Sequence, residues 1–136
     1  MKAIENAKKL LINKATCVLV KGDVEIVSEQ TGIKPMMLFI NEGKDLNGFS
    51  VADKIVGKAV AMLFKKARIK EVYAEVISKS GLQYLQDANI TTTYKILTDN
   101  IINRSGTGIC PMEETVSNIE DCEQGYVALK EKLGLL

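Results

Sequence analysis

The sequence has 136 residues, of which 46% are hydrophobic and 26% are charged, and this composition fits one globular domain with an apolar core. The formal net charge of +1 gives no overall attraction to nucleic acid or to an acidic membrane surface. The three cysteines (Cys17, Cys110 and Cys122) are far apart, and there is no histidine, so the commonest metal ligand and the commonest general base are absent.

Apolar periodicity and turn residues predict the secondary structure in chain order. A helix comes first, followed by a hairpin, a short helix, a central helix, two strands separated by a helix, and two final helices. The expected ranges are Lys2–Asn13 (helix), Thr16–Val20 and Val24–Val27 (hairpin), Met36–Ile40 (short helix), Gly48–Lys66 (central helix), Glu71–Ser78 (strand), Gly81–Ala88 (helix), Ile90–Leu97 (strand), and Pro111–Asn118 and Glu123–Leu133 (helices).

These elements indicate a single domain over residues 1–136. Strand–helix–strand order implies a parallel pair joined by a right-handed crossover. We therefore expect an α/β protein with a mixed sheet in three α/β/α layers, in which residues 1–14 form an N-terminal helix and residues 15–133 the core. No signal peptide and no membrane-spanning stretch are visible, and the separate cysteines suit a reducing compartment, so we expect a cytoplasmic protein.

The predicted central helix carries polar residues in its first turns. Ser50 and Asp53 have the spacing of a capping box, which predicts Ser50 as the N-cap. Lys54 and Lys58 are four residues apart and would share a face. Either lysine could bind an anion, with Asp53 carrying a proton; the alternative is a capping carboxylate and two solvated lysines. Gly57 would lie mid-helix, where glycine is costly unless another group packs against it.

Three segments resemble an uncharacterised bacterial family that is placed in the cytidine deaminase-like fold group. They are ADKIVGKA (52–59), VYAEVIS (72–78) and IINRSGTGICPME (101–113), and the resemblance covers residues 15–133. It implies that fold but not the zinc chemistry. Zinc deaminases need a His or Cys ligand and a Glu at the start of the central helix, then a P-C-x-x-C pair after the next strand. Ala52-Asp53-Lys54 and Ser78–Leu82 stand at those places, so we expect no zinc and no other cofactor.

The segment 103–113 is the second candidate for chemistry. Pro111 suits the first position of a helix, which makes Cys110 the N-cap and would stabilise its thiolate. The alternative is that Cys110 is a small buried filler and that the glycines only shape a turn. In the functional interpretation the segment holds a ligand through Asn103, Arg104, Gly106, Thr107, Gly108 and Glu113.

Glu75 lies in the middle of a predicted strand between Ala74 and Val76. If both faces of that strand are covered, the carboxylate needs a partner, and Lys58 is the candidate. The alternative to a structural Glu75–Lys58 pair is a carboxylate of raised pKa that lines a pocket.

Two functions of different classes follow from these residues. One is a metal-independent enzyme acting on a small anionic or nucleobase-like molecule, with Cys110 as nucleophile or acid, Asp53 as proton carrier, and Lys54 and Arg104 as anion contacts. The other is a non-catalytic binding or sensor module that uses the same pocket. Both require the start of the central helix and the segment 103–113 to meet in one cleft. Neither requires a nucleic acid or a membrane, and both leave a homo-oligomer open.

Overall fold

The computed structural model describes residues 2–103 and 105–135. Its centre is a five-stranded sheet in the order β2-β1-β3-β4-β5. The first strand, β1, is antiparallel to both β2 and β3, whereas β3, β4 and β5 are parallel, so the sheet is mixed as expected. The strands are β1 (Cys17–Lys21), β2 (Val24–Ser28), β3 (Ser50–Val56), β4 (Glu71–Ser78) and β5 (Thr91–Thr98).

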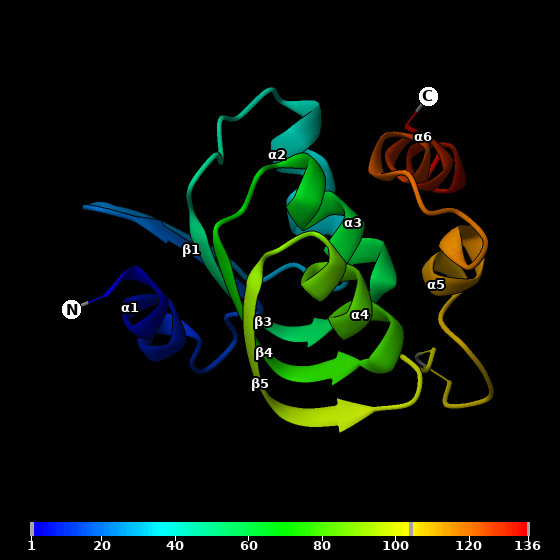
Figure 1. The fold of residues 1–136 in the computed structure, drawn as a ribbon, viewed down its shortest axis with the longest axis horizontal. Helices are drawn as coiled ribbons and strands as arrows, with labels where there is room; N and C mark the ends of the chain where they lie inside the picture. The colour runs from blue at the N-terminus through cyan, green and yellow to red at the C-terminus, as the bar shows by residue number, and fades with distance from the viewer. Residues whose placement is uncertain (1, 104, 136) are drawn as a thin grey trace.

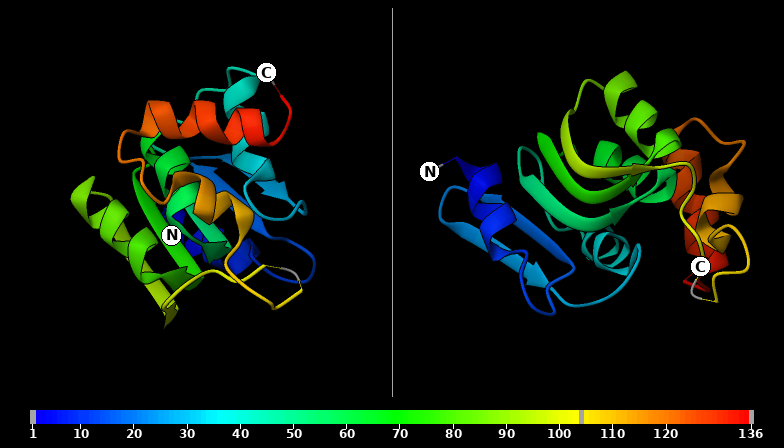
Figure 2. Two further views of the ribbon diagram at one scale, coloured as in Figure 1. Left: turned by 90° about the vertical axis from the view of Figure 1, so that its right-hand side faces the viewer. Right: turned by 90° about the horizontal axis from the view of Figure 1, so that it is seen from below.

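Helices lie on both sides of this sheet, which confirms the predicted α/β class. One helix, α1, packs on β1, β3 and β4 from one side, while α2, α3 and α4 lie on the other side with α5 and α6 beyond them against α3 (Figure 1). The right-hand view of Figure 2 shows α1 and α6 on opposite sides of the sheet. The helices are α1 (Ala3–Leu10), α2 (Lys34–Asn41), α3 (Lys58–Lys66), α4 (Lys79–Asp87), α5 (Pro111–Val116) and α6 (Cys122–Lys132). No helix in the described residues is long and apolar enough to cross a membrane.

The predicted central helix is wrong in its first half. Residues Ser50–Val56 form β3, and α3 begins only at Lys58 with Gly57 as its N-cap. The strand is covered on both sides over most of its length, so its apolar residues do not alternate with polar ones as they would in a half-exposed strand. A buried strand and a buried helix cannot be told apart by periodicity alone, and the S-x-x-D spacing of Ser50 and Asp53 therefore gave a false helix start.

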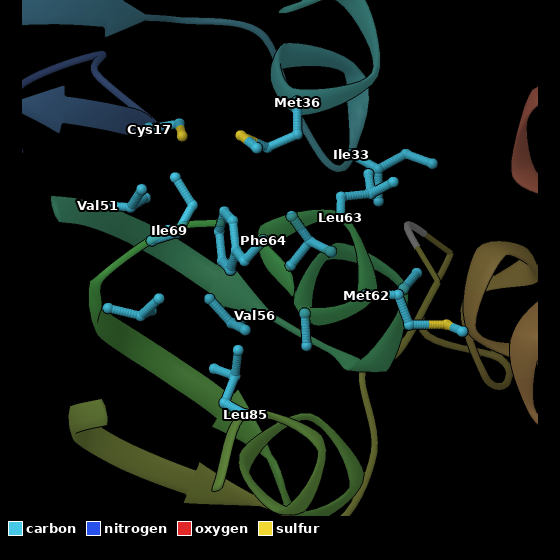
Figure 3. Close-up of a cluster of buried hydrophobic side chains, with 14 of the residues drawn as sticks. Cys17, Ile33, Met36, Val51, Val56, Met62, Leu63, Phe64, Ile69 and Leu85 are labelled. Carbon is cyan, nitrogen blue, oxygen red and sulfur yellow. The ribbon is translucent and has the colours of Figure 1, made fainter. Parts of the chain in front are cut away.

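The main apolar core lies between the sheet and the helices α2, α3 and α4. It gathers around Phe64, which is fully buried, and includes Val51 and Val56 of β3 and Met36 of α2 (Figure 3). A smaller cluster between α1 and the other face contains Ala7, Val18 and Ala52, with Tyr73 packed against it. The two clusters hold the sheet between two apolar layers, and the main one fixes the position of α3.

The parallel strands keep one pairing register, but the positions that face the core shift by one residue near the middle of the strands. Val51 and Val56 are five residues apart, yet both belong to the main core, as do Ala74 and Ile77 of β4. Strict alternation would place each pair on opposite faces. As a result Ile55 and Ile96, which both pair with Val76, remain 54% and 51% exposed. Regular alternation on the parallel strands therefore ends just before these residues.

Candidate functional site

The start of α3 is capped by a side chain from a distant part of the sequence. Gly57 has no side chain to offer, and the Glu113 carboxylate of α5 takes its place. Oε1 of Glu113 accepts the Lys58 N–H at 2.8 Å and Oε2 accepts the Ala59 N–H at 2.7 Å. The carboxylate thus satisfies two of the free N–H groups of the helix and lies at the positive end of its dipole.

The Lys58 side chain also binds the part of the chain that contains α5 and the residues just after it. Its Nζ lies 2.9 Å from Oε1 of Glu120 and donates a longer hydrogen bond, 3.4 Å, to the carbonyl oxygen of Ser117. The Lys58 side chain is only 10% exposed, whereas that of Glu120 is 81% exposed. A lysine this deeply buried needs such partners, because its charge has lost most of its water. The predicted Glu75–Lys58 pair is therefore wrong, and Glu120 is the carboxylate that pairs with Lys58.

The start of α4 lies directly beside the start of α3. Ser78 caps α4 by accepting the Gly81 N–H at 3.0 Å. A Cβ at Gly81 would lie 2.9 Å from the carbonyl carbon of Gly57, so the two backbones meet at a pair of glycines. Each helix follows a parallel strand, so both helix starts lie at the carboxyl ends of the strands. Ligands of α/β proteins commonly bind there.

An open cleft of about 480 Å³ lies at these helix starts. Its lining contains three glutamates and one lysine, which gives a formal charge of −2 at neutral pH. The Glu113 charge is balanced by the α3 dipole and the Glu120 charge by Lys58, so the charge of Glu114 is the one without such a contact in the described residues. The lining residues are Lys58, Ser80, Asn100, Ile101, Ile109, Glu113, Glu114, Ser117 and Glu120.

Asp53 and Cys17 form a separate buried pair on neighbouring strands. They are direct register partners on β3 and β1, and their residues are 6% and 2% exposed. Burial raises the pKa of Asp53 to about 7, against an opposing effect of hydrogen bonds from the Ile55 and Lys54 N–H groups and from Cys17. Burial, followed by the neighbouring Asp53 charge, raises the pKa of the Cys17 thiol well above its usual value. Neither residue is among the lining residues of the cleft.

Lys54 and Glu75 also lie outside the cleft lining. Because Lys54 is on β3 rather than on a helix, it does not share a face with Lys58, and its Nζ donates to the carbonyl oxygen of Asn13 beyond the end of α1. Glu75 is partly exposed on β4. The predicted gathering of Asp53, Lys54 and Lys58 at one helix start therefore does not occur.

The loop between β5 and α5 is closed by its own polar groups. The side-chain Oδ1 of Asn103 accepts the Thr107 N–H at 3.0 Å, and the backbone N–H of Asn103 donates to the Gly108 carbonyl oxygen at 2.8 Å. Gly106 turns the chain with a positive φ of +71°. These contacts fit the structural interpretation of the loop residues, whereas the flanking Ile101 and Ile109 line the cleft. The predicted ligand contact Arg104 lies outside the described residues.

Cys110 is the N-cap of α5 as predicted, although its side chain makes no capping hydrogen bond. It is partly exposed and is not among the lining residues, although Ile109 and Glu113 on either side of it are. Of the residues proposed from the sequence, the cleft thus brings together Lys58 and Glu113. The meeting predicted between the helix start at Asp53 and Lys54 and segment 103–113 is not found in that form, because both residues belong to β3 and lie outside the cleft lining. The segment instead reaches the actual start of α3, through the Glu113 carboxylate.

The sequence matches a known family. A family model described as TM1506, a domain of unknown function (DUF1893), matches residues 5–133. The chain belongs to the DUF1893 family. A DUF1893 family protein of known structure, TM1506 from Thermotoga maritima, is 26% identical, with a TM-score of 0.85 over 96% of this chain and 89% of that chain. The search of curated proteins found no match.

Seven of the nine residues that line the cleft of this DUF1893 chain were not predicted from the sequence. Glu120 could have been sought indirectly, because a lysine with apolar neighbours, such as Lys58, needs a carboxylate partner when it is buried. Asn100, Ile101 and Ile109 belong to the long connection between β5 and α5, and long loops inside compact domains are often functional. Ser80, Glu114 and Ser117 have no spacing or motif that would single them out.

Proposed function

We propose that this protein binds a small polar molecule in the cleft at the starts of α3 and α4 without converting it chemically. The observation that carries this proposal is the cleft itself, whose volume of about 480 Å³ falls in the usual range of small-molecule sites. Its lining combines apolar walls from Ile101 and Ile109 with the polar groups of Ser80 and Asn100. That mixture suits a flat heterocycle with donor and acceptor groups, such as a nucleobase.

Charge balance argues for a neutral or cationic molecule over an anion. The free N–H groups at the start of α3 are already occupied by Glu113, and the lysine ammonium by Glu120. A ligand phosphate or carboxylate would have to displace one of these internal carboxylates and would also approach Glu114. An amino or ring N–H group would instead find acceptor oxygens ready.

Binding is favoured over catalysis by the positions of the residues suggested as catalytic. The enzyme hypothesis needs Cys110, Asp53 and Lys54 around one reacting molecule. Asp53 instead lies in the core beside Cys17, and Lys54 extends toward Asn13. The resemblance to the cytidine deaminase-like fold remains part of this proposal, and the antiparallel β1–β2 pair followed by two parallel crossovers supports it.

A thermal-shift screen tests the proposal, because a ligand that binds only the folded protein raises its melting temperature. Nucleobases, nucleosides, amino acids and small amines form the panel, and phosphates and dicarboxylates serve as the anionic comparison. Asn100→Trp fills the cleft, whereas Asn118→Trp places the same side chain at an exposed asparagine outside the lining. A ligand of the cleft stabilises the wild type and Asn118→Trp but not Asn100→Trp. Turnover of any stabilising compound, lost on alkylation of Cys110, would instead establish the enzyme hypothesis.

A further inference from the structure

Strand β5 forms a free edge of the sheet. It pairs with β4 on one side only and is the outermost strand in Figure 1. Most of its eight residues are exposed, including Tyr94 at 43%. It contains no proline, and its composition is rich in threonine and other good strand formers. Long edges of this kind pair readily with another strand unless they are protected.

The opposite edge of the sheet is better protected. Strand β2 has only five residues, and its Glu25 carboxylate accepts a hydrogen bond from the Asn6 side chain of α1 at 2.7 Å. Short edge strands with charged residues resist pairing. The edge of β5 is therefore the one open to a partner strand.

The first five residues of β5 alternate regularly between the two faces. Thr92 and Tyr94 pair with the core residues Val72 and Ala74, so they share the core-side face. Thr93 pairs with Tyr73, which packs under α1, so Thr93 and its neighbours Thr91 and Lys95 lie on the α1 face. Beyond Lys95 this alternation breaks, since Leu97 pairs with the core residue Ile77.

We propose that β5 pairs antiparallel with β5 of a second copy of this chain, with the two Thr93 residues opposite each other. This register places Thr91 opposite Lys95 and Thr92 opposite Tyr94, so every pair joins residues of the same face. Centring the pair on Lys95 would oppose two lysines, which is unfavourable. Centring it on Tyr94 would place Thr92 opposite Ile96, where the regular alternation has ended. Thr93 is the centre of the regular stretch and the centre of the dimer.

Charge complementarity supports a second copy as the occupant. In this register Lys95 of one subunit lies opposite Thr91 of the other, and Thr91 pairs with Glu71 on β4. Lys95 and the Glu71 of the other subunit then share a face two strands apart, roughly 10 Å between Cα atoms, which two extended side chains can span. Within the described residues neither Lys95 nor Glu71 has an ion-pair partner in its own chain. The two-fold axis creates this contact twice, and the sheet continues through ten strands.

Sedimentation equilibrium of the full chain over a range of concentrations tests the proposal. The wild type should show a dimer of twice the 14.9 kDa chain mass. Lys95→Glu should weaken the dimer about tenfold or more, because two attractions become repulsions. The double variant Lys95→Glu with Glu71→Lys should restore it, while Lys14→Glu, at an exposed lysine away from β5, should leave it unchanged.

Two results would overturn the proposal. One is a wild type that stays monomeric at every concentration, which would leave the β5 edge to a different protein or to solvent. The other is a dimer that Lys95→Glu does not weaken, or one that the charge swap fails to restore although both variants keep the wild-type melting temperature and circular dichroism.

Discussion

Gly57 and Glu113 are complementary in shape although 56 positions separate them in the sequence. A Cβ at residue 57 would lie 2.3 Å from the Oε1 of Glu113, well inside van der Waals contact. The glycine therefore leaves the space in which the carboxylate caps α3. Residue 57 is the N-cap rather than a mid-helix position, yet the close approach expected from a glycine at this place exists.

Gly57→Ala should destabilise the protein by about 1–2 kcal/mol, because the added methyl group displaces the Glu113 carboxylate from its cap. Urea denaturation measures the change. The same substitution in a Glu113→Ala background should cost almost nothing, since the carboxylate is already gone. Gly108→Ala is the matched control, because a Cβ there meets no atom within 4 Å. Equal costs in both backgrounds would contradict the explanation.

Glu113→Gln should lower the free energy of unfolding by about 0.5–2 kcal/mol, because the amide replaces one of the two acceptor oxygens with an NH2 donor and has no charge to interact with the helix dipole. Glu114→Gln changes the next carboxylate along, which caps no helix in the described residues, and should leave stability nearly unchanged. Thermal melts of the two variants at low and at high salt separate the effects. A larger loss of stability in Glu114→Gln than in Glu113→Gln would show that Glu113 is not the carboxylate that caps α3.

Asp53→Asn should stabilise the protein at alkaline pH. Burial raises the pKa of Asp53 from 3.8 to about 7, so the folded state prefers the protonated carboxyl. Its contribution to stability is greatest at or below about pH 4 and falls as the pH rises to 7, where the buried group ionises. At 1.36 kcal/mol per pKa unit, the substitution should gain at most about 4 kcal/mol at pH 8 and little at pH 4.

Denaturant unfolding of the wild type and Asp53→Asn at both pH values measures this gain. Asp23→Asn, in the exposed turn between β1 and β2, is the control, and it should change the free energy of unfolding by the same small amount at both pH values. A gain that does not depend on pH would show that the Asp53 charge is not the cause.

Iodoacetamide at neutral pH should label Cys110 and Cys122 well before Cys17. Both Cys110 and Cys122 are partly exposed, whereas Cys17 is 2% exposed and has a raised pKa, so little thiolate is present and little of it is accessible. Mass spectrometry of digests taken over time follows each site. Labelling of Cys17 at the rate of the other two would mean that β1 opens readily.

Much of the fold could be predicted because its local signals were consistent. Residues Glu71–Ser78 are rich in β-branched and apolar residues between polar ends, and they form β4 over that very range. The hairpin of β1 and β2 followed from turn residues between two short apolar runs. The N-cap at Cys110 followed from Pro111, whose ring suits the first helical position.

The rest depended on packing that the sequence does not display. Ser50–Val56 could be assigned to a helix or a strand until its neighbours β1 and β4 were known. Because that strand was predicted as the start of a helix, Asp53 and Lys54 were expected at the carboxyl ends of the strands, whereas they lie inside β3, and half of the expected site was misplaced with them. The partner of Lys58 could not be chosen between Glu75 and Glu120 from spacing, because only the position of the segment after α5 decides it.

The cap on α3 has a consequence for the order in which the chain folds during synthesis. Residues 50–98 can pair into the parallel strands as soon as they emerge, but the Lys58 N–H waits for a carboxylate 55 residues further along. Closing so long a loop is slow and entropically costly compared with local contacts. We therefore expect the first turn of α3, although the helix holds the centre of the core, to stay frayed on the ribosome until Glu113 has emerged.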